Sequence, residues 1–168
     1  MAFLSRILEW RHAFFPRLSS KTILSFYLPL GGAACHTLHT VHIFYPQYLS
    51  RIFPVFDLTV SNSLLFLSNL GAGLYVYSRP HLYRVAAYDR VEFSVFSSVM
   101  FNFGSILLAV LLKALLPERS NGLLRSLIGV GLSWILLSRG HKYLRYIDSR
   151  TISSGGKPRH NTSTAGSR

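Results

Sequence analysis

Four apolar stretches of the chain predict four helices that cross a membrane. Each stretch is dominated by aliphatic and aromatic residues, and short polar segments separate them. They comprise residues 22–45, 58–77, 93–112 and 123–138. A spanning helix needs about 20 predominantly apolar residues, within a range of about 17 to 25. The sequence therefore predicts an all-α fold: a multipass membrane protein built as a four-helix transmembrane bundle.

The first and fourth stretches fit this pattern less cleanly than the middle two. Pro29 and the pair Gly31 and Gly32 interrupt the first. Arg125 leaves thirteen residues, 126–138, in the fourth, which spans only if the arginine side chain extends to the interface. In a three-pass alternative the fourth stretch lies on the membrane surface, and the two ends of the chain are then on opposite sides.

The distribution of Lys and Arg favours four passes. With four passes, the N-terminal segment, the 78–92 loop and the C-terminal segment share one side, which holds 14 of the 18 basic residues. Cytoplasmic segments of membrane proteins carry such an excess of positive charge. We therefore expect an integral membrane protein with both termini in the cytosol, or in the matrix if the membrane is mitochondrial.

The overall composition also indicates a lipid environment. Hydrophobic residues make up 49% of the chain and charged residues 14%, against about 25% charged in an average globular domain. The net charge of +12 does not predict nucleic-acid binding, because the basic residues lie between apolar stretches and not on a polar face. Cys35 is the single cysteine, which excludes an internal disulfide framework.

We expect three regions along the chain. Residues 1–21 form a basic, amphipathic N-terminal segment, typical of an interfacial helix or a mitochondrial targeting segment. Residues 22–138 form the transmembrane domain. Residues 139–168 form a basic juxtamembrane segment and a Gly/Ser/Thr-rich tail that we expect to be disordered. Arg11 falls on the apolar side of the first segment, so we prefer the endoplasmic reticulum and related membranes to the mitochondrial inner membrane.

Three histidines in the first stretch form a candidate intramembrane site. His36, His39 and His42 recur at three-residue spacing, which places them on one drifting stripe of a helix. A lone carboxylate at a membrane edge is costly, so we expect Asp57 to lie near His39 or His42. This spacing suits three roles. The first is hydrogen bonding between helices or anchoring at the membrane interface. The second is a proton relay or binding site, and the third is a metal or haem site. One helix rarely aims three imidazoles at one ion, so we favour the first role and expect no metal or cofactor.

Three asparagines form a candidate polar seam between helices. Asn62 and Asn69 are seven residues apart on one predicted helix, and Asn102 lies on the next. Membrane helices use such side chains to hydrogen-bond to one another, while glycines let their backbones approach closely. An aqueous path lined by the same asparagines is the alternative.

Basic residues mixed with aromatic ones flank the predicted membrane on its positive side. This composition suits contact with anionic lipid headgroups, and docking of a protein partner or a simple orientation signal are the alternatives. The candidate lipid contacts are Arg79, Arg84, Arg139, Lys142 and Arg145.

The motifs of common enzymes are absent from the sequence. It contains no GxSxG, no HExxH and no Gly-rich phosphate loop. We therefore expect a small non-enzymatic membrane protein that binds, positions or stabilises another membrane protein or a second copy of itself, or that organises lipid. The alternatives are a transporter, channel or proton relay that uses the intramembrane His and Asp residues, and a membrane-embedded redox protein or enzyme.

Overall fold

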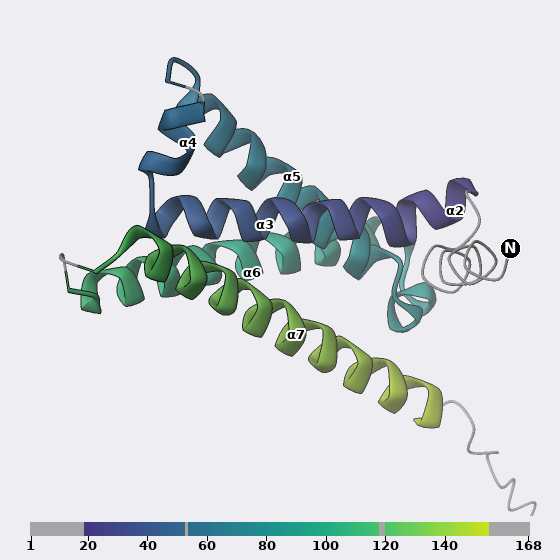
Figure 1. Cartoon of the computed structure of the whole chain (residues 1–168). Helices are drawn as coiled ribbons and strands as arrows, with labels where there is room; N and C mark the ends of the chain where they lie inside the picture. Colours follow the sequence, from purple (N-terminus) through teal and green to yellow (C-terminus); the bar gives the residue numbers. More distant parts are fainter. Residues whose placement is uncertain (1–18, 53, 118–119, 155–168) are drawn as a thin grey trace, which may run out of the picture.

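The protein is described by a computed structural model that covers residues 19–52, 54–117 and 120–154. Within these ranges every regular element is helical, as the sequence predicts. Figure 1 shows α3 running through the middle of the molecule, with α5, α6 and α7 around it. The elements are α2 (Ser20–Thr22), the π-helix η1 (Ile23–Tyr27), α3 (Leu28–Phe44), α4 (Gln47–Ile52), α5 (Asp57–Tyr77), the 3-10 helix η2 (Pro80–Arg84), α6 (Ala87–Leu115) and α7 (Gly122–Ser154).

The first predicted helix is continuous through Pro29. Elements α2, η1 and α3 follow one another without a break, and the residue at each junction keeps helical dihedral angles. Proline lacks an N–H group, and its ring collides with the carbonyl four residues earlier, which here is that of Ser25. A π-helical turn widens the helix locally. The π-helix at 23–27 therefore accommodates Pro29, and the helix is not interrupted there.

Glycines set the distances at which α3 packs against its neighbours. A Cβ atom added to Gly32 would lie 2.5 Å from the Cα atom of Gly71 on α5. A Cβ atom on Gly129 of α7 would lie 3.1 Å from the Cα atom of Val41. Such glycines allow helix backbones to approach more closely than larger residues permit. Both close contacts are thus possible because glycine has no side chain.

The molecule has two different ends, which we name after Phe44 and Tyr77. At the Phe44 end, where α3 finishes and α7 begins, Phe44, Ala109 and Leu132 form a buried hydrophobic cluster. From there α7 diverges from α3 along its length (Figure 1). At the Tyr77 end, α5 finishes, and α7 contacts η2 instead. The bundle is therefore tightly packed at the Phe44 end and more open at the Tyr77 end.

Arg90 stabilises the connection between α5 and α6 at the Tyr77 end. Its Nε and Nη2 atoms donate hydrogen bonds of 3.0 and 2.5 Å to the carbonyl oxygen of Tyr77. Its guanidinium group lies 3.9 Å from the ring centroid of Tyr77 and 4.3 Å from that of Tyr83. The last carbonyls of a helix have no partner within the helix, so Arg90 satisfies one of them and holds η2 in place.

Polar residues line the interior, and apolar residues face outward. Among the described residues, ten polar or charged side chains are buried against five hydrophobic ones. Large apolar side chains are exposed on every long helix, for example Leu58, Phe66, Phe103, Leu107 and Trp134. Soluble monomers rarely expose extended apolar surfaces of this kind. The distribution is the reverse of a water-soluble fold.

Two helices are long and apolar enough to cross a membrane. They are residues 87–115 in α6 and residues 122–151 in α7. Only 22% and 17% of their most apolar stretches are buried in the molecule. A core helix of a soluble protein would bury most of such a stretch. The two helices therefore indicate association with a membrane.

Two helices extend beyond the predicted apolar stretches. Helix α6 begins at Ala87, six residues before the stretch, and α7 continues from 138 to Ser154. The basic residues of this extension have good helix propensity, and neither Gly nor Pro occurs from 141 to 154. The first four residues of the expected tail, 151–154, are thus helical. Residues 1–18 of the predicted amphipathic segment and residues 155–168 of the tail lie outside the described ranges.

Candidate functional site

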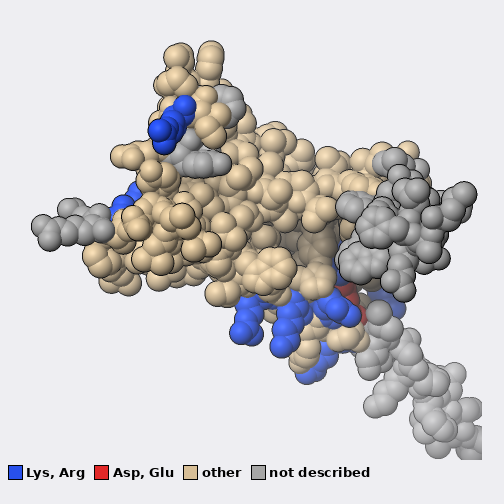
Figure 2. All heavy atoms as spheres, in the orientation of Figure 1, with Lys and Arg blue, Asp and Glu red and all other residues tan. Residues whose placement is uncertain are grey.

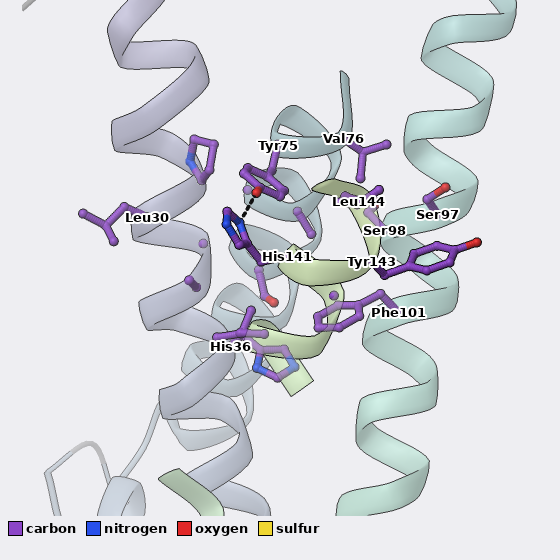
Figure 3. A pocket seen from close by; sticks show the side chains of 18 of the residues that line it. Leu30, His36, Tyr75, Val76, Ser97, Ser98, Phe101, His141, Tyr143 and Leu144 are labelled. Carbon is purple, nitrogen blue, oxygen red and sulfur yellow. Dashed lines mark hydrogen bonds between the residues drawn. The ribbon is translucent and has the colours of Figure 1, made fainter. Parts of the chain in front are cut away.

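A cavity of about 610 Å³ lies between α3, α5, α6 and α7. This volume is within the range of known ligand pockets, about 300 to 1,000 Å³. Most of its lining is aliphatic, aromatic or glycine and alanine, and Figure 3 shows the side chains around it. Apolar lining residues include Leu30, Val76, Met100, Phe101, Leu137 and Leu144.

Small residues on three helices leave the space open. Gly32 and Ala33 line the cavity from α3, Gly71 and Ala72 from α5, and Gly140 from α7. Because α7 diverges from α3 toward the Tyr77 end, these residues do not fill the gap between the helices. The same glycines that bring α3 and α5 together thus also shape the cavity wall.

A tyrosine and a histidine occupy the cavity end nearest Tyr77. Tyr75 Oη and His141 Nδ1 share a hydrogen bond, and their rings stack with centroids 6.0 Å apart. Arg79 lies over the Tyr75 ring at 4.1 Å, with Nη2 3.4 Å from His141 Nδ1. Arginine can only donate hydrogen bonds, so Nδ1 is the acceptor, the Tyr75 hydroxyl donates to it, and the imidazole carries its proton on Nε2. In Figure 3 this pair lies at one end of the cavity, and His36 lies at the other.

A carboxylate from α7 holds the adjacent 3-10 helix. Asp148 Oδ1 lies 2.6 Å from His81 Nδ1, and Asp148 Oδ2 lies 3.3 Å from Arg79 Nη1. Burial lowers the pKa of Arg79, and the charge of Asp148 opposes that shift. The Nε atom of Arg79 has no hydrogen-bond partner within the described part of the chain. Asp148 thus connects α7 to η2 and uses both its oxygen atoms to do so.

The candidate lipid contacts surround this end of the cavity. Arg139, Lys142 and Arg145 are exposed along α7, Arg84 is exposed on η2, and Arg79 is half-buried beside Tyr75. Figure 2 shows Lys and Arg side chains gathered over the C-terminal half of α7. Asp148 is the one acidic residue of α7. The Tyr77 end therefore carries a clear excess of positive charge.

The deep end of the cavity is polar and has no Asp, Glu, Lys or Arg in its lining. His36 Nδ1 lies 2.7 Å from the hydroxyl of Ser133 on α7, which also lies 3.0 Å from the Thr37 hydroxyl. His36 and Ser133 are both buried. The His36 ring also packs against Phe101, with centroids 5.4 Å apart. His36 therefore bonds between helices, in one of the roles that the sequence left open.

The other two histidines of the stripe face different surroundings. His42 Nε2 lies 3.9 Å from Asp57 Oδ1, and Ser50 donates a 2.7 Å hydrogen bond to Oδ2. Asp57 thus lies beside His42, while His39 is half-buried between the two sites. No group of three or more His, Cys, Asp or Glu side chains in the described ranges could hold a metal ion. The stripe thus diverges along the helix and does not converge on one point.

Two of the three asparagines meet in a buried network. Asn102 accepts a 2.6 Å hydrogen bond from Ser68 and donates to Asn69 Oδ1 at 3.1 Å. It also donates to the carbonyl of Ser98 at 2.9 Å. Asn62 lies apart and is exposed, because the first half of α5 leans away from the bundle (Figure 1). The network joins α5 to α6 behind the cavity.

Sequence reasoning named Arg79 and Arg145 at the charged end of the cavity, but it did not find Tyr75, His141 or Asp148 there. Tyr75 and His141 are 66 positions apart, so no local motif connects them. One signal was present: His141 and Asp148 share a helical face with the apolar Leu137 and Leu144, at spacings of three and four. Polar residues on an otherwise apolar face mark a site where a helix meets polar partners.

Comparison with protein-family models, with curated proteins and with solved structures finds no match for this chain.

Proposed function

We propose that this protein is a non-enzymatic, four-span membrane protein that binds an amphiphilic membrane component in the cavity between its helices. The observation that carries the proposal is the cavity itself. It is apolar along its walls, polar at its ends, and bounded by helices whose outward faces are apolar. This combination suits a ligand that reaches the site from a bilayer.

An arrangement with four membrane crossings explains both the apolar outer surface and the distribution of the basic residues. Helices α6 and α7 have the length and apolarity to cross, and α5 exposes Leu58, Phe66 and Leu70. The continuous helix 20–44 packs against α5 along the glycine contact. With all four crossing, the 14 basic residues of one side face the cytosol. We place both termini there, in the endoplasmic reticulum or a related membrane in preference to the mitochondrial inner membrane.

The shape of the cavity supports binding over transport. Toward the Phe44 end, its lining stops at His36 on α3, Ser68 on α5, Phe101 on α6 and Leu137 on α7. Beyond His36 the space between the helices is filled by Phe44, Ala109 and Leu132, of which the first two are completely buried. A path for ions or solutes would have to continue through this cluster. The dead end therefore favours a ligand that enters and leaves on the same side.

Bound lipid in purified protein tests the proposal. We expect native mass spectrometry of protein extracted in a mild detergent to detect a bound lipid. Ala72→Phe places a large ring in the cavity and should remove the lipid. Leu70→Phe, on the exposed side of the same helix, is the matched control and should retain it. Wild-type protein free of lipid in several detergents, or equal lipid in both variants, would refute the proposal.

Topology is tested separately from binding. In a Cys35→Ser background, Val55→Cys and Tyr88→Cys place single thiols at sites that are 83% and 80% exposed. Four crossings put these sites on opposite sides of the membrane. A membrane-impermeant maleimide should therefore label only one of them in sealed vesicles of uniform orientation. Labelling of both would exclude the proposed arrangement.

A further inference from the structure

We propose that the ligand of this cavity is a single-chain anionic amphiphile, with its aliphatic chain among the apolar walls and its carboxylate or phosphate head beside Tyr75, Arg79 and Arg145. This inference rests on the proposed function and adds the chemical class of the ligand. Three features of the cavity support it: the position of its polar groups, the sign of their charge, and its size.

The polar groups of the cavity divide it into a head region and a chain region. At the deep end, His36 and Ser133 form a buried hydrogen bond with each other. At the Tyr77 end, Tyr75 and His141 lie under the guanidinium group of Arg79. Between the two ends, the lining is dominated by aliphatic and aromatic side chains. A ligand that matches this order has one apolar chain and one polar head at the Tyr77 end.

The charges at the head region select an anion. Asp148 is already engaged through both oxygen atoms, with His81 and with Arg79. Arg145 lies four residues from His141 on α7, hence on the same side of the helix, and its positive charge lowers the pKa of Arg79. No carboxylate of the described residues lies within ion-pair distance of Arg145. Two guanidinium groups thus face one carboxylate, and an anionic head would balance the excess.

The dimensions of the cavity indicate one chain. On α5 the lining extends from Ser68 to Val76, which corresponds to about 12 Å along the helix axis. The volume of about 610 Å³ is that of a pocket for a single ligand of moderate size. We therefore propose a fatty-acid-like or monoacyl-phosphate ligand, and not a lipid with two acyl chains in the cavity.

Four lipid probes and two charge variants test this inference. The probes are oleic acid, oleoyl lysophosphatidic acid, the neutral mono-oleoylglycerol, and the two-chain dioleoyl phosphatidic acid. Their affinities for the full-length protein in detergent can be measured by competition with a radiolabelled chain. We expect at least one single-chain anion to bind about fivefold or more tightly than the neutral probe and the two-chain anion. The two single-chain anions together show whether the head is a carboxylate or a phosphate.

The charge variants locate the head. Arg145→Gln should weaken binding of the preferred anion about fivefold, with the affinity for mono-oleoylglycerol unchanged. Arg51→Gln removes the same charge at an exposed position on α4, at the other end of the molecule, and should leave every affinity unchanged. Arg145 is exposed, so the variant should fold, and unchanged neutral binding verifies this. Arg79→Lys retains the charge but loses the stacked plane over Tyr75, and it should also weaken anion binding.

The outcomes separate the ligand class from the proposed function. Equal binding of neutral and anionic single-chain probes, or equal effects of Arg145→Gln and Arg51→Gln, would overturn the anionic class while cavity binding stands. Tighter binding of the two-chain anion would overturn the single-chain assignment. No binding by any probe, with no lipid in the purified protein, would overturn both.

Discussion

Gly32 on α3 and Gly71 on α5 face each other with no room for a side chain between them. A Cβ atom on either glycine would lie 2.5 Å from the Cα atom of the other. At that distance a backbone has to move, because neither partner is a flexible side chain. The closest contact between these helices is therefore a contact between two backbones.

Alanine at either position should force α3 and α5 apart. We expect Gly32→Ala and Gly71→Ala each to destabilise the protein by about 1 to 3 kcal/mol, the usual cost of overpacking. The measurement is thermal unfolding in detergent micelles. Gly31→Ala is the matched control, because a Cβ atom there meets nothing within 4 Å. Similar melting temperatures for the Gly31 and Gly32 variants would contradict the close approach.

Asn102 should be the most sensitive residue of the polar network. Its replacement by Ala leaves the partners Ser68 and Asn69 with unmatched hydrogen-bonding groups at a buried site. Hydrogen bonds between membrane helices contribute about 0.6 kcal/mol on average and up to about 1.7 kcal/mol, so we expect a loss of about 1 to 2 kcal/mol. Asn62→Ala, at an exposed position, should cost much less in the same unfolding assay. Equal losses would place Asn62 in the interior.

The outward face of α6 should reject a charge if it contacts lipid. Phe103 lies near the middle of α6 and is 61% exposed. Phe103→Arg should therefore reduce membrane insertion by about 2.5 to 3.5 kcal/mol, measured as the inserted fraction in a translocation assay. Tyr88→Arg, at the start of the helix and 80% exposed, should have little effect. Normal insertion of the Phe103 variant would indicate that water or protein covers this face.

Asp148 should be required to hold α7 against η2. Asp148→Asn removes the charge that binds His81 and Arg79, and hydrogen bonds to charged groups contribute about 1.5 to 3 kcal/mol. We expect faster amide hydrogen exchange in 139–150 and in η2, together with a lower melting temperature. Asp89→Asn changes an exposed carboxylate in the same region and is the control. Unchanged exchange in the Asp148 variant would show that α7 is held by other contacts.

Hydrophobic pattern predicted the helices well, because lipid-length apolar stretches leave few alternative folds. It located the segments that became α5, α6 and the first half of α7, and it identified glycines as points of close approach. It failed at the helix ends. Beyond 138 the residues are charged, and only their helix propensity indicates that α7 continues to Ser154.

The candidate site was harder to predict, because it depends on contacts between distant segments. Spacing placed the three histidines on one stripe, but the stripe drifts around the helix, so that His36 meets Ser133 of α7 while His42 meets Asp57 of α5. The partner of His81 is Asp148, 67 positions away along the chain, and no local pattern connects the two. A cavity is even harder to predict from a sequence, because it forms where side chains are small and where α7 diverges from α3.

The length of α7 has a mechanical consequence. Its 33 residues form an unbroken rod of about 50 Å, while the hydrocarbon core of a bilayer is about 30 Å thick. In the proposed four-span arrangement, the helix would project well beyond the lipid on one side, with Arg150 on the projecting part. Because Leu137 and Leu144 on the same helix form part of the cavity wall, the projecting segment and that wall belong to one continuous helix, and a displacement of one would move the other.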